Sequence, residues 1–309
     1  MRRRPDVTLT QLRYFVKAAT HSSMTKAADE LHIAQSAVSA AISQLEQQIG
    51  SQLFIRHRAR GLALTAAGEE MLRDTRALLA HLDEVLDSAS GRVDQVHGTV
   101  RLACFVTLTP FVLPRLLSDL GTLHPDLEVE VIETSADAIR TVLRNGTAEL
   151  ALTYDLGLGA GVDAEYVGVA APYVALPSEH RLAKRKSIRL TELADEPMVL
   201  LDLPDSRDYF EAMLVKAGVK PRIRYRSASY EAVRGLVARG HGFSILNQMP
   251  AHQGTYDGGT VATVAIKDDL PGLPVVLARL QAVRTTARAR AVAAAARAIF
   301  ADREGPGGA

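Results

Sequence analysis

Residues 9–49 place apolar side chains at the spacing of three short helices, and this pattern constrains the fold more than any other in the chain. The spacing predicts helices over residues 9–18, around residues 27–31 and over residues 35–49. Ala27 and Ala28 are small, as a close helix crossing requires, and Gly50 is expected to end the third helix. Three helices with a tight turn between the second and third are typical of a helix-turn-helix unit.

The outer face of the third helix is small and polar and has no charge before Glu46. Its side chains are Gln35, Ser36, Ser39, Ala40, Ser43 and Gln47. A face that only meets solvent usually carries Lys and Glu, so a packing unit with a polar outside is the less favoured alternative. Small hydrogen-bonding groups let a helix enter the DNA major groove and touch base edges, so we expect this face to read DNA.

A basic turn at residues 57–61 separates two short extended runs and predicts a hairpin, or wing, beside the helices. Arg56, Arg58 and Arg60 would reach phosphates or the minor groove from this wing. Lys26 and the three arginines at positions 2–4 would add phosphate contacts.

The net charge of +1 conceals a segregation along the chain. Residues 1–65 hold nine Lys or Arg and four Asp or Glu, which gives +5, and the remainder holds 27 and 31, which gives −4. A basic segment in an otherwise neutral chain indicates nucleic-acid contact, although a solvated basic surface would give the same sum.

Residues 66–90 are predicted to form one long helix, with Thr65 as its N-cap. Its apolar seam has heptad-like spacing and consists of Met71, Thr75, Leu78, Leu82, Leu86 and Ala89. The alternative to a dimerising linker is packing against its own domain. The length of the seam favours the linker.

Residues 9–70 resemble the LysR-type transcriptional regulators. The matching positions are Leu9, Leu12 and Phe15; Ala27, Ala28 and Leu31; Gln35 to Ser39; Ile42, Leu45 and Glu46; Leu53, Phe54 and Arg56; and Leu64, Thr65, Ala67, Gly68 and Glu69. The resemblance implies an N-terminal all-α winged helix-turn-helix, a dimerising linker helix and a C-terminal effector-binding domain. Ser36 stands where the family often has Pro, and Ala40 stands where it often has Arg or Lys.

From residue 99 onward, strand and helix patterns alternate, which predicts parallel α/β sheets. The expected strands are 99–105, 127–133, 149–154, 197–201, 222–225 and 242–246, and the expected helices are 110–120, 136–144, 207–217 and 230–239. Two such groups of units indicate two subdomains.

The resemblance implies that these subdomains form a two-lobed domain like that of periplasmic binding proteins, hinged by crossing strands. We expect the crossing strands near residues 165–176 and 274–282. The expected organisation is a DNA-binding domain at 1–65, the linker helix at 66–90 and an effector-binding domain at 91–309. Within the last, lobe one covers 91–167 and 277–300, and lobe two covers 168–276.

Ligands of such sheets bind at the C-terminal ends of strands, against helix N-termini. The polar groups expected there are Thr107, Thr109, Thr134, Ser135, Tyr154, Asp155, Asp202, Ser206, Ser229 and Asn247. Ordinary capping is the alternative for each of them, and Ser206 would cap the helix that follows it. Hydroxyls and helix amides suit a small carboxylate, whereas the aspartates suit an amine or a hydroxyl-rich ligand, so the effector class stays open.

No catalytic constellation, metal-ligand spacing or cofactor loop is found in the sequence, so we expect no enzyme activity, no metal and no cofactor. Cys104 is the sole cysteine and lies in an apolar strand, which indicates a core thiol and not a redox sensor. With no signal peptide and no apolar run of membrane length, a cytoplasmic protein without a membrane partner is expected.

These features together predict a ligand-responsive transcriptional regulator. Its expected partners are a pseudo-palindromic double-stranded promoter site, a small-molecule effector, and further copies of the chain as a homodimer through the linker helix and a homotetramer, with RNA polymerase as a candidate. Two rival hypotheses are an enzyme or transport-type binding protein with a DNA-binding head, and a constitutive architectural DNA binder.

Overall fold

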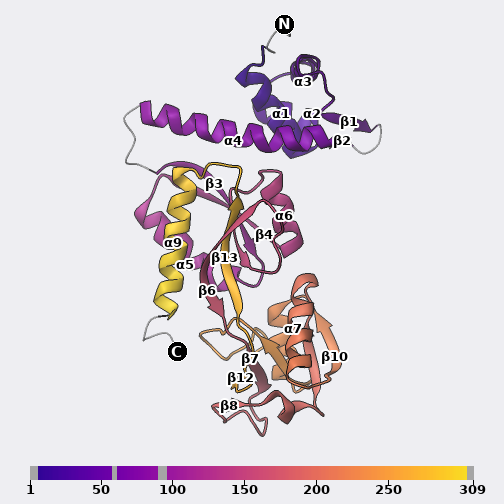
Figure 1. The fold of residues 1–309 in the computed structure, drawn as a ribbon, viewed down its shortest axis with the longest axis vertical. Coiled ribbons are helices and arrows are strands. Elements are labelled where there is room, and N and C mark those ends of the chain that lie inside the picture. Colours follow the sequence, from indigo (N-terminus) through magenta and orange to yellow (C-terminus); the bar gives the residue numbers. More distant parts are fainter. Residues whose placement is uncertain (1–5, 58–60, 90–95, 305–309) are drawn as a thin grey trace. The chain divides into compact units, whose positions relative to one another are not determined.

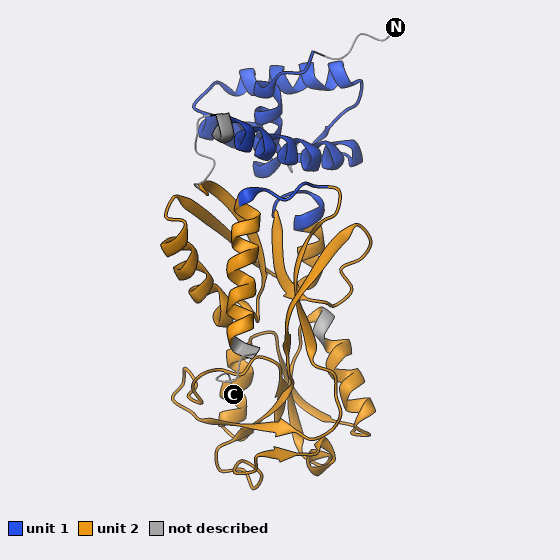
Figure 2. Ribbon diagram, turned by 60° about the vertical axis from the view of Figure 1, so that its left-hand side comes forward, with its two compact units in different colours: residues 1–95, 142–148, 283–287 blue, residues 96–141, 149–282, 288–309 orange. Residues whose placement is uncertain are grey.

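The computed structural model describes residues 6–57, 61–89 and 96–304, and leaves the side chains of residues 57, 61, 87–89, 205, 206, 303 and 304 undescribed. The chain separates into two compact units (Figure 2). Unit 1 comprises residues 1–95, 142–148 and 283–287, and unit 2 comprises residues 96–141, 149–282 and 288–309.

The N-terminal part of unit 1 contains the three expected helices followed by a hairpin and a long helix (Figure 1). The elements are α1 (Leu9–His21), α2 (Met24–Leu31), α3 (Gln35–Ile49), β1 (Phe54–His57), β2 (Gly61–Leu64) and α4 (Ala66–Ala89). Thr8 begins α1 as the capping residue, since its hydroxyl accepts from the Gln11 N–H at 3.2 Å and the Gln11 side chain accepts from the Thr8 N–H at 2.8 Å.

Apolar faces of these helices meet in one core. Its fully buried members are Leu12, Phe15, Ala18, Met24, Ala27, Ala28, Val38, Ile42, Leu45, Leu53, Phe54 and Leu72. The small Ala27 and Ala28 are buried as expected, whereas Ile49, the last expected inward residue of α3, is 37% exposed at the end of the helix. The helical period therefore predicts the core correctly up to the last turn of α3.

The long helix α4 divides into two parts with different surroundings. Thr65 caps it as predicted, because its hydroxyl accepts from the Gly68 N–H at 3.0 Å. In the first half, Leu72 and Thr75 are buried, and Leu72 belongs to the core of unit 1. In the second half, Leu78 and Leu86 are 51% and 55% exposed. The expected seam is thus not one continuous face: its first half packs on its own domain.

Unit 2 begins with a five-stranded sheet in the order β4-β3-β5-β13-β6. Its strands are β3 (Gly98–Phe105), β4 (Leu127–Thr134), β5 (Leu150–Tyr154), β6 (Val162–Ala170) and β13 (Leu273–Leu280). Strand β3 pairs in parallel with β4 and β5, but β13 pairs antiparallel with β5 and β6. The three strands expected within residues 99–154 are therefore parallel as predicted, and the sheet is mixed because β13, from late in the chain, returns into it in the opposite direction.

Three helices accompany this sheet: α5 (Thr109–Leu123), α6 (Ala136–Arg144) and α9 (Ala287–Glu304). Helices α5 and α9 lie side by side in Figure 1, and Arg115 of α5 pairs with Asp302 of α9. Helix α9 also packs against β6, where a Cβ at Gly168 would meet the Phe300 ring at 2.8 Å.

The rest of unit 2 is built on a four-stranded sheet in the order β11-β7-β12-β8 and a parallel pair β10-β9. The elements are β7 (Tyr173–Pro177), β8 (Ser187–Ile188), a short 3-10 helix (Leu190–Leu193), β9 (Pro197–Leu201), α7 (Pro204–Lys216), β10 (Arg222–Ser227), α8 (Tyr230–Ala238), β11 (Ser244–Leu246) and β12 (Val261–Ile266). A bridge between Met198 and Phe243 joins the pair to the larger sheet. Strand β7 pairs antiparallel with both neighbours, so this sheet is mixed as well.

The chain passes between the two sheets twice, and the first passage lies within the segment expected to cross at 165–176. The segment expected as one strand over 165–176 is broken at Ala171 and Pro172 into β6 and β7, which belong to different sheets. Pro172 has no N–H to continue a ladder, which accounts for the break. The second passage lies at residues 267–272, between β12 and β13, so the segment expected to cross at 274–282 lies within the five-stranded sheet. Across the described ranges, the structure contains no helix with the length and apolar character of a membrane span.

Candidate functional sites

Helix α3 presents the uncharged face that its sequence predicts. Gln35, Ser36 and Ala40 are exposed, and Ser39 and Ser43 are half-buried on the same side. Val38, Ile42 and Leu45 face the core and fix the rotation of the helix. The residue before α3 is Ala34, whose methyl group cannot cap the helix, so the first amides of α3 are left for water or an acceptor such as a phosphate oxygen.

The hairpin lies against this helix. Strands β1 and β2 pair antiparallel from Phe54 with Leu64 to His57 with Gly61. The guanidinium of Arg56 lies 3.4 Å from the Ser43 hydroxyl, which brings a positive charge to the edge of the α3 face. The Glu46 carboxylate accepts from the Leu53 and Phe54 N–H groups at 2.7 and 3.1 Å, and thereby joins α3 to the start of the hairpin.

Of the other residues expected to contact phosphates, the structure describes only Lys26. Lys26 is exposed in the first turn of α2, where the Ser23 hydroxyl accepts from its N–H at 3.3 Å. Arg58, Arg60 and the arginines at positions 2–4 lie outside the described residues. The surface that the structure describes therefore consists of the α3 face, Arg56 and Lys26.

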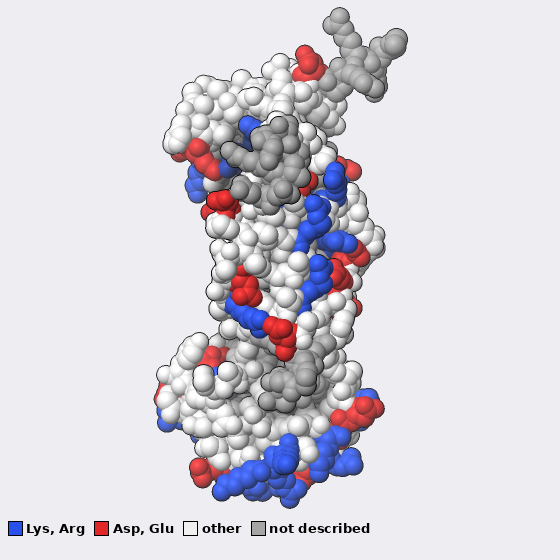
Figure 3. Space-filling view, turned by 90° about the vertical axis from the view of Figure 1, so that its left-hand side faces the viewer, with Lys and Arg blue, Asp and Glu red and all other residues white. Residues whose placement is uncertain are grey.

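A second basic surface lies in unit 2, at the end where Figure 1 labels β8, and Figure 3 shows Lys and Arg gathered at this end. The segment around β8 contributes the exposed residues Arg181, Lys184, Arg185, Lys186 and Arg189. Arg181 pairs with Glu196, and Arg185 with Glu192, so part of this charge is neutralised locally. The −4 sum of the C-terminal part therefore does not describe an evenly acidic surface.

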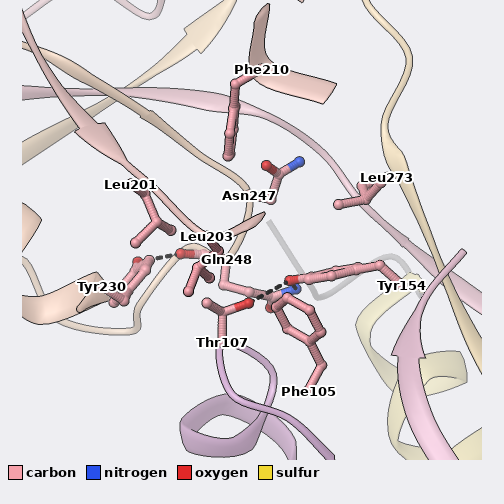
Figure 4. Close-up of a pocket in the computed structure, with 10 residues that line it drawn as sticks. All are labelled: Phe105, Thr107, Tyr154, Leu201, Leu203, Phe210, Tyr230, Asn247, Gln248 and Leu273. Atoms are coloured by element: carbon pink, nitrogen blue, oxygen red, sulfur yellow. Dashed lines mark hydrogen bonds between the residues drawn. The ribbon is translucent and has the colours of Figure 1, made fainter. Parts of the chain in front are cut away.

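A pocket in unit 2 gathers side chains from strand ends and helix starts (Figure 4). Its lining residues are Phe105, Thr107, Tyr154, Leu201, Leu203, Phe210, Tyr230, Asn247, Gln248 and Leu273. The space between them is about 310 Å³, including the part that opens to solvent. Phe105, Thr107, Tyr154 and Leu273 come from the five-stranded sheet and its loops, and the others follow β9 or β11 or lie on α7 and α8.

A set of hydrogen bonds closes one side of this pocket. The Tyr154 hydroxyl accepts from Thr107 Oγ1 at 3.4 Å and from Gln248 Nε2 at 3.1 Å, as Figure 4 shows. The backbone carbonyl of Gln248 accepts from the Tyr173 hydroxyl at 3.1 Å and from the Tyr230 hydroxyl. Since Tyr154 ends a strand of one sheet and Gln248 follows a strand of the other, these bonds connect the two sheets across the pocket.

Asn247 lines the pocket and has a fully buried polar atom without a hydrogen-bond partner. Its Nδ2 group donates to the Ala170 carbonyl and to the Tyr209 hydroxyl, both at 3.0 Å. Its Oδ1 atom is buried and has no hydrogen-bond partner. A buried acceptor without a partner is costly, which indicates that another molecule supplies the donor.

Burial sets the ionisation of the phenols here. It raises the pKa of both Tyr154 and Tyr230 to about 12, and it raises that of Tyr173 further. The pocket wall is therefore uncharged at neutral pH.

Three of the ten expected effector-binding residues line the pocket: Thr107, Tyr154 and Asn247. Six others do not, and they are Thr109, Thr134, Ser135, Asp155, Asp202 and Ser229, while the side chain of Ser206 lies outside the described ones. For these, binding stays a prediction without support from this pocket.

Three of these residues, Thr109, Asp202 and Ser229, make hydrogen bonds within the protein. Thr109 is buried and donates to the Phe105 carbonyl at 3.4 Å, and Ser229 caps α8 by accepting from the Ala232 N–H at 3.3 Å. The hydrogen bond from Arg207, at 2.6 Å, is the main cause of the lowered pKa of Asp202. The N-cap position of α7, which begins at Pro204, is held by Leu203 and not by Ser206.

The sequence analysis did not predict seven of the lining residues, which comprise the apolar side of the pocket and Gln248. The missed residues are Phe105, Leu201, Leu203, Phe210, Tyr230, Gln248 and Leu273. Phe105 and Leu201 are the last residues of β3 and β9, so the rule that sites lie at strand ends would have found them had it been applied to apolar residues too.

Cys104 is buried in β3, and burial raises the pKa of its thiol to about 11. The prediction of a core thiol is confirmed.

Comparisons with known proteins match both parts of the chain. A family model described as a bacterial regulatory helix-turn-helix protein of the lysR family matches residues 9–69, and a model of the LysR substrate binding domain matches residues 94–301. The RuBisCO operon transcriptional regulator of Allochromatium vinosum is 32% identical over 245 residues, which cover 78% of this chain and 80% of that protein. A hydrogen peroxide-inducible genes activator of Pectobacterium carotovorum subsp. carotovorum is 26% identical over 245 residues, covering 77% and 79%. The crystal structure of HinK, a LysR family transcriptional regulator from Pseudomonas aeruginosa, aligns with a TM-score of 0.64 at 31% identity, covering 96% of this chain and 99% of that one.

Proposed function

The chain belongs to the LysR family of transcriptional regulators, and we propose that α3 with the hairpin contacts DNA while the pocket of unit 2 receives the effector. The protein is a DNA-binding regulator whose activity is modulated by a small molecule. The proposal assigns each half of that function to named residues. We keep the division expected from the sequence: a DNA-binding domain to residue 65, a linker helix over 66–90 and an effector domain beyond it.

The uncharged face of α3 beside Arg56 is the observation that carries the DNA-binding assignment. Gln35, Ser36, Ser39, Ala40 and Ser43 would face base edges in the major groove. Arg56, Lys26 and the arginines of the hairpin tip would hold phosphates and supply the salt-dependent part of the affinity. Helix α3 would thus recognise the base sequence, while Lys26 and the hairpin would supply the electrostatic attraction to phosphates.

The effector would act through the bonds that connect the two sheets. A ligand among Thr107, Tyr154 and Asn247 touches residues from both sheets, so its binding would favour one relative arrangement of the sheets over others. A dimer through the exposed second half of α4, and a tetramer of two dimers, would transmit that change to paired recognition helices on a pseudo-palindromic site. RNA polymerase is a candidate further partner in the cytoplasm.

We also propose that the protein binds its effector without converting it. A molecule that raises the melting temperature should be recovered chemically unchanged after incubation with the protein. Formation of a product would favour the rival hypothesis, an enzyme with a DNA-binding head.

Gel-shift titrations on the DNA that flanks its gene test the DNA-binding assignment. Arg56→Ala should weaken binding and reduce the slope of log affinity against log salt by about one, because one phosphate contact is lost. Lys184→Ala removes an exposed positive charge from the second basic surface and serves as the matched control, with affinity and slope unchanged. Equal losses in both variants would contradict the assignment.

A further inference from the structure

The ten residues that line the pocket include no carboxylate, ammonium, guanidinium or imidazole. Six of them are apolar: Phe105, Leu201, Leu203, Phe210, Leu273 and, over most of its ring, Tyr230. The two phenols stay uncharged because burial raises the pKa of each to about 12. An ionised ligand in this pocket would therefore find no opposite charge on its walls.

The nearest buried cation already has its partners. The Arg234 guanidinium lies 6.0 Å from the centre of the Tyr230 ring. It donates to Glu231 at 2.7 Å and to the carbonyls of His252 and Gly254 at 3.1 and 2.9 Å. Glu231 and the two carbonyls, none of which belongs to the lining, thus take up the charge and donors of Arg234.

A second charged group beside the lining is Asp202, between Leu201 and Leu203. It pairs with Arg207 at 2.6 Å and with Arg226 at 3.4 Å. The Asp202 carboxylate is therefore paired, and the two arginines leave the cluster with a net charge of +1 on residues outside the lining.

What the lining does offer is one buried acceptor. The orientation of Asn247 is fixed, because its amide nitrogen donates to the Ala170 carbonyl and to the Tyr209 hydroxyl, and the latter itself donates to the Pro271 carbonyl at 3.0 Å. The Oδ1 atom is left buried without a donor. The pocket is thus apolar, uncharged and short of one hydrogen-bond donor.

We propose that the pocket selects a small uncharged molecule that has an apolar part and a hydroxyl or amide donor for Asn247 Oδ1. The inference rests on the proposed function, in which this pocket receives the effector. It departs from the carboxylate that helix amides suggested from the sequence, since a carboxylate here would lose its water and gain no charged side chain.

Matched amides and acids test the proposal on the full-length protein. The probes are isobutyramide with isobutyrate and benzamide with benzoate, and methyl benzoate as a neutral ring without a donor. Thermal shift and titration calorimetry at neutral pH should give an affinity for at least one amide about tenfold or more above that of its acid. Methyl benzoate should bind more weakly than benzamide, because it leaves Asn247 Oδ1 unpaired.

A pair of variants shows whether binding occurs in this pocket. Leu203→Arg adds a cation to the wall and should reverse the preference toward the acid, whereas Leu203→Met keeps the size without charge and should preserve the amide preference. Circular dichroism checks that both variants fold.

The outcomes separate the two claims. An acid that binds the wild type as well as its amide, with binding altered by Leu203→Arg, would overturn the ligand class and leave the pocket as the effector site. Binding by no probe of either charge would overturn the ligand class together with the assignment of this pocket. Amide binding unchanged in both variants would show a site elsewhere and would likewise overturn the proposal.

Discussion

Gly68 shows how closely single residues set the geometry of the DNA-binding domain. It lies in the first turn of α4, and a Cβ there would meet the Leu53 carbonyl oxygen at 2.1 Å. That oxygen also accepts from the Thr65 N–H at 3.0 Å, so it cannot move without loss of a hydrogen bond. The glycine of the family motif therefore has a packing reason in this chain.

Gly68→Ala is expected to destabilise the domain by about 1–3 kcal/mol or more, because the added methyl group must displace backbone. Gly121→Ala is the matched control, since Gly121 is also helical but nothing lies within 4 Å of its Cβ position. That change should be neutral or should stabilise by about 0.5–1 kcal/mol. Calorimetric melting of both variants measures the difference, and equal effects would contradict the packing argument.

Cys104 carries a prediction about redox chemistry. Burial raises the pKa of its thiol to about 11, so the thiolate, which is the reactive form, is scarce at pH 8. Against an ordinary thiol pKa near 8.5, the thiolate fraction falls roughly a hundredfold. We expect slow labelling by a disulfide reagent in the native protein and fast labelling after unfolding.

The same thiol bears on a relative that is named for hydrogen peroxide. Exposure of this protein to hydrogen peroxide should leave its DNA affinity unchanged, and Cys104→Ser should do the same. A peroxide response that disappears in Cys104→Ser would contradict this account.

At the scale of elements, the helical period located the expected helices, but it did not predict α9, and it gave no guide to the pairing of strands. Helix α3 begins and ends at the expected residues because Val38, Ile42 and Leu45 face one core. Strands β8 and β12 were missed, since a two-residue strand and an antiparallel return leave little local pattern. The break at Pro172 was visible in the sequence, yet which sheet each side joins depends on partners far along the chain.

The second half of α4 carries the dimer prediction. Leu78 and Leu86 are about half exposed, and a charge at either place would be buried in an interface. Leu86→Glu should weaken dimerisation by about tenfold or more, measured by light scattering over a dilution series. Asp83→Lys makes a larger change of charge at an exposed polar position of the same helix and should leave the dimer intact. If both variants dimerise like the wild type, α4 is not the interface.

At the scale of the whole molecule, the sequence predicted which region of the chain would bind an effector better than it predicted the individual residues that line the pocket. Thr107, Tyr154 and Asn247 were found because polar groups after strands were sought. The apolar wall was not found, because Phe105, Phe210 and Leu273 come from distant segments and resemble core residues when each is taken alone. Composition of the pocket, and with it the ligand class, is a property of the folded chain.

The charge split along the chain had a similar limit. It indicated the basic DNA-binding segment, but it hid the second basic surface around β8. The net charge of a segment cannot distinguish the two basic surfaces. They differ because the first combines Arg56 with the uncharged face of α3.

The central claim is that α3 reads a specific DNA sequence under the control of a small molecule in unit 2. Nuclease footprinting on the DNA flanking its gene tests this directly, with wild type and a Gln35→Ala, Ser39→Ala double variant, each with and without a ligand that raises the melting temperature. We predict a defined footprint whose extent the ligand alters, and loss of that footprint in the double variant, which still binds the ligand. Uniform protection that neither the ligand nor the double variant changes would contradict the account.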